Sequence, residues 1–600
     1  MKLWKGDSIH GKPPYVSLIS WLAILAFSAL SLGPLFLGLK LLSSVTGISP
    51  IFAPFYWGSH PAQAGALAFS ISMAATAAIL TICFGLPIAW VLGRYSWKRG
   101  RLLRALLALP FVTPAIVAAM GFLALIDKSG PLVKLGIDLR GESGFIGWLN
   151  ENVGASIGIE HLGHWLALEM ALVWFNISLA IRFLEPTIAN MDPNREAQLK
   201  LLPAGQSKIS VFREVWLPTL WPGIAATAGL TFAFSFTSFA LVRWLTPYSN
   251  SLETLMGTYG RSAGIENYAI DSSLLVLSAS LIQFIIVGST LVLVAWMQKK
   301  SHVIHHQVSE KHARKTTGKP TMAARVLIFA SLVYSLTPLV VPIISSFRLQ
   351  RRFIASNGQT EVEYYWSSEA WKIAWQGDLS ASGAGEALIH GLGYAAFTLF
   401  VALPICLIIS SKIVELERAG RRWTAFFVDA TTMIPLAVSG AMVGLGVLLG
   451  ILRWLPQMFS WYWLPALAHV MLVMPFLTRM LLPTIRSLDP ALEENARLLK
   501  MGYFARLYHI KLPSLSSSIV VASALALAFS LGEFGASWVL MRSGSWDTLS
   551  ILVDSIMSRP AYFPMVRPVA MACASILLFV TLALFLLAEQ FRSQTDVQGM

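Results

Sequence analysis

An acidic side chain stands inside one of the most apolar stretches of the sequence. Glu533 lies in the run Ser530-Leu531-Gly532-Glu533-Phe534-Gly535-Ala536. A carboxylate near the centre of a bilayer costs on the order of 3 kcal/mol, so we expect Glu533 to face the interior of a helix bundle or water. Two roles stay open for it. Glu533 contacts a transported solute or a gate, or it bonds structurally to neighbouring backbone or to a basic residue such as Arg542.

The other groups that could do chemistry point away from catalysis. Glu169, in a second apolar run, is expected to form a hydrogen bond between helices. The sequence contains no G-x-x-x-x-G-K-[ST], so a phosphate-binding loop for ATP is not expected. The apolar segments also contain no His-x-x-x-His, paired aspartates or Ser/Lys dyad. We therefore expect a protein that is not an enzyme, with no cofactor or metal on this chain.

Two charged loops match each other and indicate an internal repeat. Residues 192–205 (DPNREAQLKLLPAG) align without a gap on 489–502 (DPALEENARLLKMG). In each copy Asp can cap a helix, Pro suits its first turn and Gly can end it. Each loop is thus predicted to be a helical hairpin in water, followed by Leu-Pro at a membrane helix. Such a hairpin suits docking into a partner's groove, and a matched pair favours docking over an ordinary interfacial loop.

These loops resemble the signature of the permeases of binding-protein-dependent ABC importers, roughly E-A-A, three residues, G, nine residues, I-x-L-P. In the second copy Glu494-Asn495-Ala496 stands at the family spacing from Ile510-Lys511-Leu512-Pro513, but Gly502 lies two residues late. In the first copy Gly205 and Pro218 are correctly spaced, while Glu196-Ala197 lies three residues early. The resemblance covers essentially the whole chain.

The resemblance implies that each loop is a coupling helix seated in a cleft of an ATP-binding subunit. It assigns this contact to Glu196, Ala197, Gly205, Leu217 and Pro218 in the first copy and to Glu493, Glu494, Ala496, Gly502, Leu512 and Pro513 in the second. The implied partners are two ATP-binding cassette subunits, as a homodimer that holds ATP and Mg, and a periplasmic substrate-binding protein. The Glu533 run also looks like a stretch of permeases for oxyanions, iron(III) and related solutes. Glu533 and its aligned position Ser238 are therefore expected in the translocation pathway.

The elements that must position these residues are membrane helices. Apolar residues make up 56% of the chain and charged residues 13%, too little polar surface for soluble domains of this length. Stretches of about 20 apolar residues, long enough to cross a bilayer, recur along the chain. Twelve are predicted, at 16–39, 66–92, 105–126, 164–181, 219–241, 273–297, 326–347, 389–410, 424–451, 461–478, 516–540 and 568–588.

The distribution of basic residues predicts the orientation. The net charge is +14, but most of the 45 Lys and Arg residues fall in the segments that share one side if the N-terminus is cytoplasmic. This pattern indicates an inner-membrane protein with both termini cytoplasmic and argues against nucleic-acid binding.

The predicted fold is an all-α polytopic membrane protein of two homologous six-helix halves, which the resemblance identifies with the type I importer permease fold. We expect a first half at 1–297, a cytoplasmic linker at 298–324 and a second half at 325–600. The linker is rich in Lys and His and lacks apolar periodicity.

Two functions are weighed. The favoured one is the permease of an ABC importer, which translocates a small solute delivered by a binding protein and is driven by ATP hydrolysis on partner subunits. The alternative is a secondary transporter of the major-facilitator type, which shares six plus six helices and a basic linker. The paired loops favour the importer. Fused permeases of this appearance resemble the iron(III) and thiamine group, and oxyanion and polyamine systems are related, but the helices do not choose among these solutes.

Overall fold

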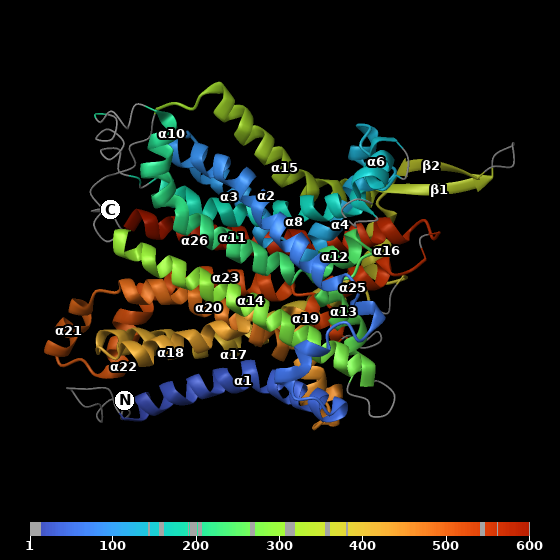
Figure 1. Ribbon diagram of the computed structural model, residues 1–600. Helices are drawn as coiled ribbons and strands as arrows, with labels where there is room; N and C mark the ends of the chain where they lie inside the picture. The colour runs from blue at the N-terminus through green and yellow to red at the C-terminus, as the bar shows by residue number, and fades with distance from the viewer. Residues whose placement is uncertain are drawn as a thin grey trace.

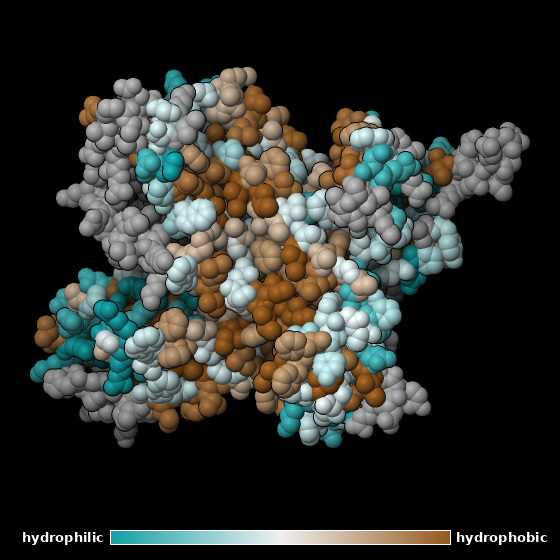
Figure 2. Space-filling view, in the orientation of Figure 1, coloured by the Kyte–Doolittle hydropathy of each residue, from teal (hydrophilic) through white to brown (hydrophobic). Residues whose placement is uncertain are grey.

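The structure, a computed structural model, describes residues 14–141, 144–154, 161–189, 191, 201, 207–263, 270–305, 318–354, 360–379, 382–540, 546–560 and 562–598. It is an all-α, multi-pass helix bundle with one small β-hairpin (Figure 1). Apolar side chains gather over the middle of the face seen in Figure 2, with polar ones toward the two ends. This distribution fits a helix bundle whose middle part lies in the hydrocarbon region of a membrane.

The elements follow one another in a similar order in the two halves. The main helices up to the linker are α1 (Pro14–Thr46), α2 (Ala66–Arg94), α3 (Gly100–Val112), α4 (Ala115–Ile126), α8 (Leu162–Ala189), α11 (Leu217–Phe236), α12 (Phe239–Leu245), α13 (Leu252–Gly260) and α14 (Ile270–His305). Short helices α5 (Pro131–Lys134), α6 (Gly144–Leu149) and α10 (Lys208–Val211) lie between them.

The second half adds a hairpin and a longer set of short helices. Its elements are α15 (Met322–Phe347), β1 (Arg348–Ile354), β2 (Thr360–Trp366), α16 (Glu369–Gln376), α17 (Ala384–Arg418), α18 (Arg422–Met433), α19 (Gly440–Leu445), α20 (Leu464–Ser487), α21 (Pro490–Leu498), α22 (Tyr503–Arg506), α23 (Leu512–Leu531), α24 (Gly535–Val539), α25 (Leu549–Met557) and α26 (Val566–Gln598).

Eleven helices among the described residues are long and apolar enough to cross a membrane, one fewer than predicted. The difference lies at 424–451, where the chain is helical in pieces: α18 ends at Met433, a turn of 3₁₀ helix covers Ile434–Ala437, and α19 begins at Gly440. Pro435 has no N–H to donate, and its ring obstructs the preceding turn. The aligned segment of the first half also breaks, between α3 and α4 at Thr113-Pro114, although Pro110, which aligns with Pro435, lies inside α3.

The first helix of each half packs on the other half. Helix α1 lies against α17, α19 and the π-helical turn Gly446–Ile451. A Cβ on Gly450 would come within 2.2 Å of the Pro34 carbonyl oxygen, so glycine permits this close approach. In the opposite direction α15 packs on α4, and Trp174 Nε1 of α8 donates to the Ser335 carbonyl at 3.0 Å. The two halves are therefore interlocked.

A two-stranded hairpin and α16 follow α15, in a region where the sequence predicted no element. Strand β1 pairs antiparallel with β2 from Arg348↔Trp366 to Ile354↔Thr360. The hairpin projects from the end of the bundle opposite α21 (Figure 1). We call that end the outer end, following the orientation expected from the basic residues. The missed signal was Asn357-Gly358 between two runs of strand-forming residues.

Candidate functional site

The second of the two matched loops forms the hairpin that the sequence predicted, which we call the coupling hairpin (residues 489–511). The Asp489 side chain accepts from Ala491 N at 2.9 Å and caps α21, with Pro490 in the first turn. The expectation that Gly502 ends α21 was wrong. Lys500, at φ 57°, takes the left-handed conformation after α21, and Gly502, at φ −63°, instead precedes α22. Residues 499–502 thus connect α21 to α22.

Ion pairs hold the coupling hairpin closed. Glu493 lies 3.0 Å from Arg497 on the same helix and 3.0 Å from Lys511 at the far end of the hairpin. Partial burial opposes ionisation of Glu493, but Lys511 and Arg497 outweigh it and hold the pKa of this carboxyl below its ordinary value. Arg506 is buried and donates to the Met501 carbonyl. Glu493 therefore fixes the shape of the hairpin.

The coupling hairpin presents two exposed leucines at the end of α21. Leu498 and Leu499 are 80% and 76% exposed, and the neighbouring Glu494 is also exposed, whereas Ala496 is buried. Leu512 and Pro513 begin α23 directly after the hairpin. A capped helix that presents two adjacent leucines at one end of the bundle can seat in an apolar groove of a partner.

Only the end of the first loop is described. Glu196, Ala197 and Gly205 lie outside the described residues, whereas Leu217 and Pro218 begin α11. The approach to that helix repeats the second copy: α10, the π-helical turn Phe212–Trp216 and then α11, matching α22, the π-helical turn Leu507–Lys511 and α23. The repeat seen in the sequence is thus also a repeat in local structure.

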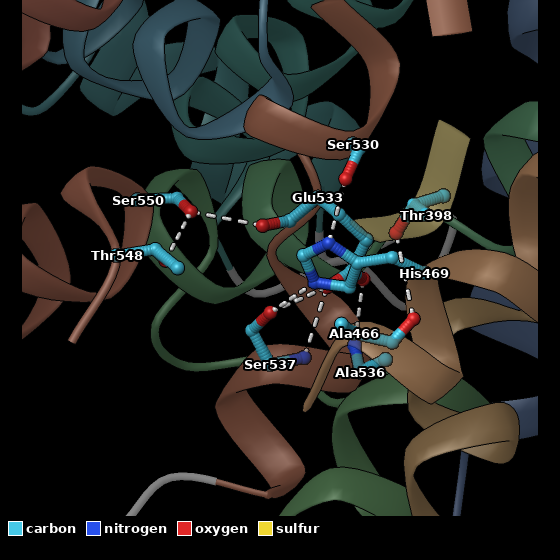
Figure 3. Close-up of polar contacts among 9 residues, drawn as sticks. All are labelled: Thr398, Ala466, His469, Ser530, Glu533, Ala536, Ser537, Thr548 and Ser550. Atoms are coloured by element: carbon cyan, nitrogen blue, oxygen red, sulfur yellow. Dashed lines mark hydrogen bonds and ion pairs between the residues drawn. The ribbon is translucent and has the colours of Figure 1, made fainter. Parts of the chain in front are cut away.

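Glu533 lies in a buried polar network. It lies at the break between α23 and α24, where its carboxylate accepts from Ala536 N at 2.7 Å, Ser537 N at 2.9 Å and Ser537 Oγ at 2.8 Å. His469 of α20 lies 3.4 Å from the same carboxylate (Figure 3). Arg542, the basic partner considered from the sequence, lies outside the described residues.

The network extends around His469. Its two ring nitrogens lie 2.8 Å from Ser530 Oγ and 2.9 Å from Ser537 Oγ. On the other side, Ser550 Oγ donates to the Glu533 backbone carbonyl at 2.8 Å, so α25 is tied to the same break (Figure 3). The sequence analysis missed His469, since a lone histidine in an apolar helix gives no signal of its partner.

The matching position in the first half is built differently. Ser238 precedes α12 and makes no side-chain cap. A buried acid with hydrogen-bond partners lies farther along the chain in this half. It is Glu253, on α13, which accepts from Gln283 Nε2 at 2.9 Å and from Ala441 N of α19 at 3.3 Å. Sequence reasoning missed Glu253 because it follows a polar loop rather than interrupting an apolar run. Glu253 and Glu533 thus come from different positions of the repeat.

The expectation for Glu169 was wrong. This residue is 2% exposed in α8, and neither carboxylate oxygen has a hydrogen-bond partner among the described residues.

Comparison with known proteins finds similarity to transport permeases. Residues 85–303 match a family model described as the binding-protein-dependent transport system inner membrane component. The matched segment begins within α2 and ends within α14, so it contains the first loop and the break before α12.

Three relatives show the extent of the similarity. A sulfate transport system permease protein of Salmonella typhimurium is 29% identical over 210 residues, 35% of this chain and 69% of the relative. A protein named as a sulfate permease in Chlorella vulgaris is 30% identical over 177 residues, 30% of this chain and 58% of the relative. One named for 2-aminoethylphosphonate in Salmonella paratyphi A is 26% identical over 177 residues, 28% of this chain and 66% of the relative.

The chain therefore spans about three fifths to two thirds of the length of these relatives, and each relative aligns with only about a third of this chain. Residues 85–303 are thus similar to the inner membrane component of binding-protein-dependent transport systems, and the eleven apolar helices among the described residues support a multi-pass membrane protein.

Proposed function

We propose that this chain is the transmembrane permease of an ATP-driven importer. Two ATP-binding cassette subunits hold ATP and Mg and seat on the two coupling loops, while a periplasmic binding protein delivers a small solute to the outer end. The chain lies in a bacterial inner membrane with both termini cytoplasmic, and ATP-driven closure of the partner subunits alternates the access of the path.

The coupling hairpin is the observation that carries this proposal. Its helix is capped by Asp489, braced by Glu493 and tipped by the exposed pair Leu498 and Leu499. A second copy of the same loop sequence precedes α11. A major-facilitator transporter has no need of such a pair, because it has no partner ATPase.

The solute is proposed from the relatives. They are named for sulfate and 2-aminoethylphosphonate, which are oxyanions. Among the iron(III), thiamine, oxyanion and polyamine classes, an oxyanion is therefore the first to test. Uptake of labelled sulfate and of labelled 2-aminoethylphosphonate by cells that express this chain with its ATP-binding subunits and binding protein would decide it.

Replacing the two exposed leucines tests the partner contact. Burying one leucine side chain is worth about 1.5–3 kcal/mol. We therefore expect Leu498→Ser with Leu499→Ser to weaken co-purification of a tagged ATP-binding subunit by at least about tenfold. The matched control is Leu135→Ser, because Leu135 is 75% exposed after α5 and lies far from the hairpin in the sequence. Equal recovery of the ATPase subunit with all three chains would refute the proposal.

A further inference from the structure

The two halves meet at the outer part of the bundle through matched elements. Helix α12 of the first half corresponds to residues 534–540, which include α24, and α13 corresponds to α25. In this register Phe239 matches Phe534, and their rings pack together with centroids 5.6 Å apart. Contact between matched residues is expected on the axis of a pseudo-two-fold interface. Figure 1 shows α12, α13 and α25 toward the end away from α21.

The first off-axis contact is an ion pair between the halves. Arg243 of α12 donates to Asp554 of α25 through Nε at 2.8 Å and Nη2 at 3.3 Å. Two indole N–H groups donate to the same carboxylate, from Trp244 at 3.1 Å and from Trp538 at 2.9 Å. Asp554 is 2% exposed, so its charge is neutralised by these donors rather than by water.

The second off-axis contact joins the residues at the matching positions. Trp538 corresponds to Arg243, and Gly257 corresponds to Asp554. The Trp538 ring packs on Gly257: a Cβ there would lie 3.2 Å from Trp538 Cζ3 and 2.7 Å from Phe239 Cε2. Arg261, just after α13, donates to the Trp538 carbonyl at 2.6 Å and stacks 4.0 Å over its ring. On one side of the axis the halves are thus joined by an ion pair, and on the other side by the packing of the large Trp538 side chain on Gly257.

We propose that the contacts Arg243 to Asp554 and Trp538 to Gly257 are the two sides of a latch that closes the translocation path at the outer end. This inference rests on the proposed importer function, in which the closure must part when the partner subunits close on ATP. Both contacts join α12–α13 of the first half to α24–α25 of the second half. Separation of the halves at this end must therefore break both contacts together.

Two buried acids brace the latch. Glu253 of α13 reaches across the halves to Ala441 N, and Glu533 holds the start of α24, the helix that carries Trp538. A Cβ on Gly440 would lie 3.0 Å from Glu533 Oε1, so the start of α19 lies against both acids. Glu533 is therefore a positioning residue for the latch, which places it at a gate without contact to the solute.

The test uses the complex of this chain with its ATP-binding subunits in lipid nanodiscs, without the binding protein. Asp554→Asn keeps the size of the side chain but removes the charge that Arg243 pairs with. We expect ATP hydrolysis in this variant to rise about tenfold over the unmodified complex, because a weaker latch populates the outward-open state that hydrolysis requires. Gly257→Ala, which pushes Trp538 and Phe239 away, is expected to raise the rate in the same direction.

The matched control is Asp138→Asn. It also removes the charge of an aspartate, but Asp138 accepts from Arg140 N at 3.1 Å within one turn of the first half, far in the sequence from both the latch and the coupling hairpin. We expect its rate to equal that of the unmodified complex. An unchanged or lower rate in both Asp554→Asn and Gly257→Ala, in complexes of normal subunit content, would overturn the latch.

A second readout does not use ATP. Ala240, 3% exposed on α12 beside Phe239, is replaced by Cys, and its reaction with a membrane-impermeant maleimide is followed. We expect the cysteine at position 240 to react faster in a chain that also carries Asp554→Asn than in one that does not. The labelling of a chain without the new cysteine is subtracted from both. Equal labelling of the two chains would refute the latch, whether or not the ATP-binding subunits bind. Failure of the ATP-binding subunits to bind would instead refute the importer function.

Discussion

Glu533 and Ser238 occupy matching positions of the repeat but have different surroundings. Glu533 fills the break before α24 with three hydrogen bonds, whereas Ser238 precedes α12 without a side-chain cap. The carboxylate stands in the half whose short helix, α24, carries Trp538, whereas the short helix α12 of the other half carries Arg243. The difference in residue type thus follows the difference in what each helix must hold.

Glu533→Gln should lower uptake of the transported solute by roughly tenfold, while the amount of chain in the membrane stays the same. The amide presents N–H donors where Ala536 and Ser537 already donate, and hydrogen bonds to charged groups are worth about 1.5–3 kcal/mol. Uptake into membrane vesicles and immunoblotting measure the two quantities. Ser238→Ala is the matched control and is expected to transport normally; equal activity of both variants would remove Glu533 from the gate.

At the scale of elements, the outer hairpin offers side chains of the kinds that dominate protein interfaces. Trp366, Tyr364 and Tyr365 are exposed on β2, and the Arg348 guanidinium lies 4.0 Å over the Tyr364 ring. An isolated two-stranded hairpin is marginally stable in water, so a partner that covers these residues would stabilise it. The binding protein of the proposed function approaches from this end.

Replacing residues 350–364 by a short Asn-Gly turn should therefore reduce the stimulation of ATP hydrolysis by the binding protein several-fold. The rate without the binding protein should not change, because the latch and the coupling hairpin are untouched. Val362→Ser serves as the control, since it alters one exposed side chain and keeps the strands. Full stimulation in the shortened chain would show that the hairpin is not a docking element.

The sequence predicted the helices better than it predicted their breaks and contacts. Long apolar runs fixed eleven spans, and the Asp-Pro start of α21 was read correctly, because both signals are local. The segment 424–451 appeared continuous since Pro435 interrupts backbone bonding without lowering hydropathy. Arg243 and Asp554 are 311 residues apart, so no local pattern could pair them, and the repeat became informative only once the two halves were seen face to face.

At the scale of the whole molecule, the latch requires two different halves. If two copies of the first half faced each other, Arg243 would meet Gly257 twice and its charge would have no acidic partner. Two copies of the second half would set Trp538 against Asp554 twice, without an arginine. Only a first half that faces a second half therefore places Arg243 against Asp554 and Trp538 against Gly257.

A chain divided in the segment between α14 and α15 should therefore still assemble. We expect residues 1–305 and 318–600, co-expressed as separate chains, to co-purify and to retain most of the uptake of the intact chain. Each half expressed alone should fail to give a stable pair, as judged by size-exclusion chromatography in detergent. An active complex formed by one half with itself would contradict the pairing described for the latch.

The exchange of first helices bears on how the protein is made. The chain enters the membrane from its N-terminus, so α8 is present before α15 has been synthesised. Until then Trp174 lacks the Ser335 carbonyl, and the Met170 carbonyl lacks the Tyr334 hydroxyl that donates to it at 2.6 Å. The first half therefore lacks these two contacts while it is alone in the bilayer. It can complete its packing only after α15 of the second half has been synthesised and inserted.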